Sequence, residues 1–196
     1  MYFTHSLAGA IAVKPIIEKV EKNFTEKEKV VLWFIGITAS VLPDFDLLYM
    51  FLSKSESHRY FATHGIALYL IIFVVTYLLR FIQEKKEFGR KFFKVAPFIF
   101  LAGVLTHFIL DALVGGIAFF SPFSHRIIGF DMNIRKEGVN WLSEYLKSKY
   151  MYLEFLVTSI FLYVFKEKKS IVPRIFSLFY FIVALVSFIL ISTLMS

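Results

Sequence analysis

Residues 95–120 read VAPFIFLAGVLTHFILDALVGGIAFF, and this run decides the fold more than any other stretch of the chain. Its only ionisable side chains are His107 and Asp111. A helix needs roughly 17–25 predominantly apolar residues to cross a bilayer. Backbone polar groups in lipid must bond internally, and an apolar run of this length does so as a helix. We therefore predict a membrane-spanning helix that carries a His–Asp pair.

Other apolar runs lie on both sides of this one, at residues 30–52, 62–82, 150–165 and 171–194, with a less regular run at 3–20 that contains Lys14 and Pro15. The composition agrees, because 58% of the 196 residues are hydrophobic and the mean hydropathy is +0.68. Soluble domains contain about 45–50% apolar residues. We expect an all-α, polytopic membrane helical bundle with five or six transmembrane helices, forming a single domain over residues 1–196.

The basic residues fall in short clusters between the apolar runs. The net charge of +7 is compatible with nucleic-acid binding, but this clustering fits membrane topology better. If six helices alternate in direction, fifteen of the 22 Lys and Arg residues lie on one side of the membrane. Short cytoplasmic loops are enriched in Lys and Arg, so that side is predicted to be cytoplasmic. We expect a multi-pass protein of the inner or plasma membrane that binds no nucleic acid, and the pattern does not indicate an oligomeric state.

The remaining polar residues converge on the opposite, extracytoplasmic side, which receives all five histidines. Ionisable groups within a span are costly and usually mark ion sites, proton paths or bound ligands. His107 and Asp111 are four residues apart, so a helix places them on one face. Pro43 interrupts the hydrogen-bond ladder just before Asp44 and Asp46, and local unwinding there could aim both aspartates inward. Separate structural roles for these residues are the alternative.

These residue types indicate a metal site. The chain has no cysteine, so imidazoles and carboxylates are the available ligands, and their mixture suits zinc, manganese or ferrous iron. The candidate ligands are His5, Asp44, Asp46, His58, His64, His107 and Asp111. They exceed the needs of one tetrahedral ion, so we expect one or two ions, the latter sharing a bridging carboxylate. The candidate catalytic residues are Asp46, Arg59 and His125, with Arg59 as a fixed cation for a substrate phosphate or as an exposed loop arginine.

The order of these motifs resembles a known family. Thr4-His5 is followed by Leu42-Pro43-Asp44-Phe45-Asp46, by His58-Arg59 with Thr63-His64, by His107-Phe108-Ile109-Leu110-Asp111 and by Pro122-Phe123-Ser124. Residues 1–125 thereby resemble the YdjM-like family of predicted inner-membrane, metal-dependent hydrolases. That family reads His-Arg-Gly-x-Thr-His-Ser where this chain has one more residue and ends in Gly65. Whether both His58 and His64 are ligands therefore stays open.

A fainter similarity to bacterial zinc-dependent phospholipase C favours phosphoester chemistry. The expected membrane location points to a lipid or lipid-linked substrate, with the bilayer as partner. In the outer segment 121–149, Trp141, Leu142, Tyr145 and Leu146 recur at helical spacing, which predicts an interfacial helix or a simple surface helix.

The leading hypothesis is a membrane-embedded metal-dependent phosphoesterase, phospholipase-like in its substrate. A divalent-cation or proton transporter is the first alternative, although the inner halves of the spans are apolar. A non-catalytic membrane protein with a structural metal is the second.

Overall fold

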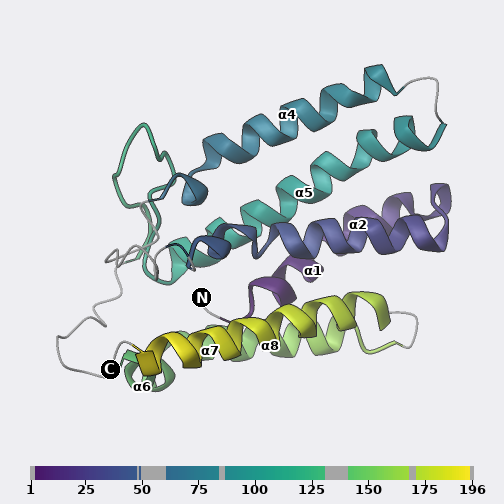
Figure 1. Cartoon of the computed structure of the whole chain (residues 1–196). Coiled ribbons are helices and arrows are strands. Elements are labelled where there is room, and N and C mark those ends of the chain that lie inside the picture. Colours follow the sequence, from purple (N-terminus) through teal and green to yellow (C-terminus); the bar gives the residue numbers. More distant parts are fainter. Residues whose placement is uncertain are drawn as a thin grey trace.

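The computed structural model describes residues 3–47, 49, 61–83, 87–130, 141–167 and 171–194. Within these residues the fold is all-helical and contains no strand (Figure 1). The elements are α1 (His5–Val20), η1 (Glu21–Asn23), α2 (Glu26–Ala39), η2 (Leu42–Asp46), η4 (Ala62–His64), α4 (Ile66–Ile82), α5 (Glu87–Leu113), α6 (Trp141–Lys147), α7 (Tyr150–Val164) and α8 (Ile171–Leu194), where η denotes a 3-10 helix. The predicted all-α class is therefore confirmed.

Helix α1 forms the centre of the bundle. It contacts α2 and α5 on one side and α7 and α8 on the other, while α4 packs against α5 at the outer edge (Figure 1). The helix continues through Pro15 without a break. Half of its residues are buried, including Leu7, Val13 and Ile17. This central position lets the first residues of α1 reach side chains of η2 and α5.

Among the described residues, α5 alone is both long and apolar enough to cross a membrane. Helices α4 and α7 and the segment Ile171–Ser187 of α8 are apolar but shorter. Five or six spans therefore stay a prediction.

Two of the predicted runs have different bounds from those expected. Residues 30–52 do not form one helix, because α2 ends at Ala39 and the chain turns into η2 with Pro43 in its first turn. The run 95–120 is helical only as far as Leu113. There Gly115 and Gly116 have φ of 114° and 71°, a left-handed conformation that ends helices and that glycine adopts at little cost. The turn into η2 and the end of α5 place Asp44 and Asp111 at the same end of the bundle.

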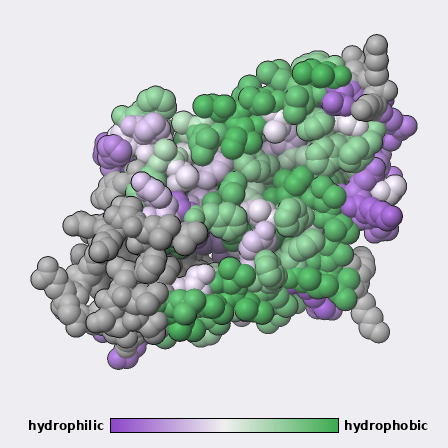
Figure 2. All heavy atoms as spheres, in the orientation of Figure 1, coloured by the Kyte–Doolittle hydropathy of each residue, from purple (hydrophilic) through white to green (hydrophobic). Residues whose placement is uncertain are grey.

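The surface of the bundle carries a broad hydrophobic band. Figure 2 shows hydrophobic residues over the middle of the helices on the face drawn, with hydrophilic residues gathered toward the two ends. On α4, Ile71, Val75, Leu78 and Phe81 are each more than half exposed. Apolar surface of this extent is unusual for a soluble monomer and suits contact with lipid.

Helices α2 and α5 approach each other closely at two glycines. A Cβ atom added to Gly103 of α5 would overlap the carbonyl oxygen of Gly36 on α2 and would lie 3.0 Å from the Cβ of Ala39. Small residues allow this distance between helix backbones, as is common in membrane bundles. The close contact holds the end of α2 against α5, one turn from His107.

Candidate metal centre

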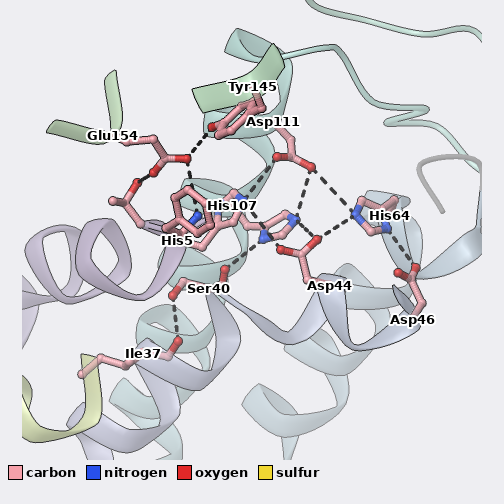
Figure 3. Close-up of polar contacts among 12 residues, drawn as sticks. His5, Ile37, Ser40, Asp44, Asp46, His64, His107, Asp111, Tyr145 and Glu154 are labelled. Atoms are coloured by element: carbon pink, nitrogen blue, oxygen red, sulfur yellow. Dashed lines mark hydrogen bonds and ion pairs between the residues drawn. The ribbon is translucent and has the colours of Figure 1, made fainter. Parts of the chain in front are cut away.

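Four predicted ligands meet where η2, η4 and α5 come together. Each of Asp44, His64, His107 and Asp111 offers a donor atom, and these atoms all lie within 4.8 Å of one another (Figure 3). His64, His107 and Asp111 are buried, whereas the Asp44 side chain keeps 21% of its surface exposed. The expected convergence of α5 and the Pro43 turn is therefore confirmed for these four residues. A buried group of this kind could hold a metal ion.

The end of α2 fixes the orientation of His107. Its Nδ1 lies 2.9 Å from the carbonyl oxygen of Ser40. A carbonyl can only accept, so Nδ1 carries the proton and Nε2 is left with a lone pair. That Nε2 lies 3.6 Å from Oδ2 of Asp111 and 3.7 Å from Oδ1 of Asp44. The free lone pair of His107 thus points into the group of donors.

An aspartate orients His64 in the same way. The Nδ1 of His64 donates to Oδ2 of Asp46 at 2.9 Å, and the hydroxyl of Thr63 donates to the same oxygen. The Nε2 on the other side of the ring lies 3.6 Å from Oδ1 of Asp44 and 3.9 Å from Oδ2 of Asp111. Metal-bound histidines almost always donate their second ring nitrogen to a carboxylate or carbonyl, as both imidazoles do here.

His5 lies beside this group at the start of α1. Its ring stacks on that of His107, with centroids 4.0 Å apart and planes 22° apart. The Nε2 of His5 is 3.2 Å from Oδ1 of Asp111 and 3.7 Å from Oδ2 of Asp44. The carboxylate oxygens that face His5 are thus not the ones that face His64 and His107.

The donor set fits a divalent transition metal in number, type and spacing. A tetrahedral zinc ion with bonds of about 2.0–2.1 Å keeps its donors about 3.4 Å apart. The nitrogen–oxygen separations of 3.6–3.9 Å around His64 and His107 are close to that value. Two carboxylates that share a buried site also repel each other unless a cation lies between them. Among the described residues, the buried Nε2 of His107 has no hydrogen-bond partner, as expected of a metal ligand.

The other predicted site residues are placed differently. Asp46 lies behind His64, where it holds the ring, and it is not one of the four convergent donors. His125 is exposed in the segment that follows α5, and the structure does not bring it to the group. His58 and Arg59 lie outside the described residues.

A second polar network adjoins the metal centre. The buried carboxylate of Glu154 on α7 accepts from the hydroxyl of Thr4 at 2.6 Å and from that of Tyr145 at 2.5 Å. This network joins α6 and α7 to the residue that precedes His5 (Figure 3). The predicted helix around Tyr145 is confirmed as α6, in which Tyr145 is buried and donates to Glu154.

Sequence reasoning missed two positioning groups. The Thr63-His64 pair stands out in the sequence, but nothing in it predicts that the Thr63 hydroxyl donates to Asp46. Ser40 acts through its backbone carbonyl, which no residue type signals. The structure also explains why glycine stands at position 65, where the resembled family has serine. A Cβ atom on Gly65 would overlap the carbonyl oxygen of Ser121, which lies directly against it.

A groove of about 350 Å³ opens beside the metal centre, between η2, η4 and the first turns of α4. Its lining is mostly apolar and consists of Leu42, Phe45, Asp46, Thr63, Leu68, Tyr69 and Ile72. Asp46 is the residue that links the groove to His64. Phe45 and Leu68, at 55% and 41% exposure, leave the groove accessible from outside the bundle.

Comparison with known proteins gives one finding. A family model described as YdjM inner membrane protein matches residues 1–192, nearly the whole chain and well beyond the motifs that end at residue 125. No curated protein and no solved structure matches the chain.

Proposed function

Because this chain belongs to the YdjM inner membrane protein family, we propose that it is a membrane-embedded, metal-dependent hydrolase of a phosphoester. The observation that carries the proposal is the convergence of Asp44, His64, His107 and Asp111 within 4.8 Å. In both histidines Nδ1 is already bonded, so both Nε2 atoms are directed into the site. Zinc suits this donor set best, with manganese or ferrous iron as alternatives.

A divalent ion in such a site lowers the pKa of a bound water toward 7 and stabilises negative charge on a phosphoryl group. In the proposed hydrolysis a water oxygen would bond to phosphorus, the ester P–O bond would break, and the proton lost by the water would end on the departing alkoxide oxygen. Asp46 and the Ser40 carbonyl keep the imidazoles in the required tautomer. Arg59, outside the described residues, remains a candidate to bind the phosphate, and His125 remains a candidate for proton transfer.

The apolar groove supports a lipid substrate. It runs from exposed apolar side chains of η2 and α4 to Asp46, one hydrogen bond from His64. An acyl chain placed there would bring its head group to the metal centre while its tail stays in contact with the apolar face of α4. A soluble phosphoester has no tail to place in this groove, so the apolar lining favours amphipathic substrates.

The packing at the other end of the bundle favours hydrolysis over transport. A cation pathway needs polar groups along its length. Between α1, α2 and α5 the interior away from the site is filled by a cluster of apolar side chains, which includes Val13, Leu32 and Ile99. The polar donors are concentrated at one end, as in a site that binds and reacts rather than one that conducts.

The test combines metal analysis with hydrolysis. The chain purified in detergent should contain zinc, and it should cleave phosphatidic acid or bis-p-nitrophenyl phosphate in a manner abolished by EDTA and restored by zinc. His107→Ala should lose both properties. Protein that binds no transition metal, or that hydrolyses neither substrate when loaded with metal, would rule out the proposal. Zinc uptake into proteoliposomes without hydrolysis would instead favour the transporter.

A further inference from the structure

The two carboxylates among the four donors, Asp44 and Asp111, each have one oxygen on the side of His5 and the other on the side of His64 and His107. Oδ1 of Asp44 is 3.6 Å from Nε2 of His64, whereas its Oδ2 is 3.7 Å from Nε2 of His5. Oδ2 of Asp111 is 3.6 Å from Nε2 of His107, whereas its Oδ1 is 3.2 Å from Nε2 of His5. Each carboxylate therefore divides its oxygens between two groups of imidazoles. A carboxylate shared by two metal ions has this arrangement.

His5 itself lacks the partners that a buried imidazole needs. Its side chain is 2% exposed, and neither ring nitrogen has a hydrogen-bond partner among the described residues. Leaving a buried polar group unsatisfied costs about 1–3 kcal/mol. The close approach of its Nε2 to two carboxylate oxygens shows where a missing partner would lie (Figure 3).

The residues on both sides of His5 hold it in place. Thr4 donates through its hydroxyl to Oε2 of Glu154 at 2.6 Å, and Ser6 donates through its hydroxyl to the carbonyl oxygen of Ser177 at 2.8 Å. These bonds attach the first turn of α1 to α7 and α8. An imidazole that is fixed on both flanks but unbonded itself is typical of a ligand arranged in advance for its ion.

We propose that a second divalent transition-metal ion binds between His5, Asp44 and Asp111, so that the two aspartates bridge it to the ion held by His64 and His107. This inference rests on the proposed function and specifies the number of ions and their ligands. One imidazole and two carboxylate oxygens are three protein ligands, the number typical of a site that keeps a position open for water or substrate. Paired ions are a common arrangement for phosphoester hydrolysis, because they can bind the attacking and the leaving oxygen together.

The first test is metal stoichiometry. The full chain in detergent is saturated with zinc, passed through a desalting column and analysed by inductively coupled plasma mass spectrometry. Wild-type protein should hold two zinc ions per chain, and His5→Ala and His5→Gln should hold one. His125→Ala, which removes an exposed histidine outside the group, is the matched control and should hold two. The glutamine variant retains a polar side chain and guards against a simple loss of folding.

The second test measures the coupling between the two ions directly. Manganese-loaded wild-type protein should give the electron paramagnetic resonance spectrum of an exchange-coupled pair, and His5→Gln should give the six-line spectrum of an isolated ion. One ion per chain in wild-type protein, or two in both His5 variants, would overturn the second site while leaving the hydrolase proposal intact. Wild-type protein that binds no metal would overturn both.

Discussion

The Nδ1 of His64 donates a 2.9 Å hydrogen bond to Oδ2 of Asp46, and this bond gives the two aspartates of the Pro43 turn different roles. Asp44 faces the opposite ring nitrogen, at 3.6 Å from Nε2. In an α-helix two residues separated by one lie about 200° apart and point to nearly opposite sides. In the 3-10 helix η2 both reach the same imidazole from its two edges. One aspartate therefore offers a ligand, and the other sets the tautomer of a neighbouring ligand.

Removing Asp46 should weaken metal binding without removing a ligand. Groups that orient a ligating histidine typically contribute about 10–100-fold to metal affinity. We expect Asp46→Ala to lower zinc affinity by about that factor and Asp46→Asn, whose amide oxygen can still accept from His64, to lower it less. Competition with a chromophoric chelator measures the dissociation constant. Glu144→Gln, an exposed carboxylate on α6, is the control, and an Asp46→Ala affinity equal to that of Glu144→Gln would contradict the assigned role.

The contact between α2 and α5 gives a prediction about stability. Gly103→Ala should destabilise the protein by about 1–3 kcal/mol, because its Cβ would overlap the backbone oxygen of Gly36. Gly89→Ala on the same helix would place its Cβ 2.8 Å from the Cβ of Gln83, away from the contact between α2 and α5, and a gain of up to about 1 kcal/mol in helix propensity should offset part of that cost. Thermal unfolding in detergent, followed by tryptophan fluorescence, should show the larger fall in Tm for Gly103→Ala. Equal shifts would mean that the helices can separate at no cost.

Much of the site could be predicted because its candidate ligands are ionisable residues within or beside apolar segments, where such residues are rare. His107 and Asp111 are the only ionisable residues of an otherwise apolar run, and their spacing of four fixes them on one helix face. Pro43 likewise marked the change of backbone geometry that brings Asp44 to them. Local rules were sufficient at these positions, since the helix period determines the direction of each side chain.

The sequence could not predict which of these residues are candidate ligands and which orient a ligand. Asp44 and Asp46 are chemically identical, and only the placement of η4 decides which of them faces Nδ1 of His64. The role of Ser40 depends on a backbone carbonyl at the end of α2, and so on where that helix stops. Helix α5 ends at Leu113 because two glycines follow it with positive φ. Both glycines lie inside an apolar run that continues to residue 120, so apolar character alone predicted a longer helix.

The network around Glu154 should hold α6 on the bundle. Tyr145→Phe removes one donor to this buried carboxylate, and the loss of a hydrogen bond to a charged group costs about 1.5–3 kcal/mol. We expect a lower Tm and faster hydrogen exchange across residues 141–147, measured by mass spectrometry. Tyr152→Phe, at a tyrosine that is 76% exposed, is the matched control and should change neither property. Unchanged exchange in α6 after Tyr145→Phe would show that other contacts hold this helix.

The groove beside the metal centre predicts which substrates a bulky side chain will exclude. Leu68 lines the groove and Leu70 does not, although the two are 41% and 43% exposed on the same helix. We expect Leu68→Trp to displace about two methylenes of a bound acyl chain. At about 0.8 kcal/mol for each methylene left in water, this loss corresponds to a rise of about fifteenfold in KM for phosphatidic acid. Hydrolysis of bis-p-nitrophenyl phosphate should be unchanged, because that substrate has no acyl chain to place. Leu70→Trp adds the same indole to an exposed position of α4 outside the groove and should affect neither substrate. If Leu68→Trp impairs both substrates equally, the tryptophan disturbs the metal centre itself, and if it impairs neither, the acyl chain of the substrate lies elsewhere.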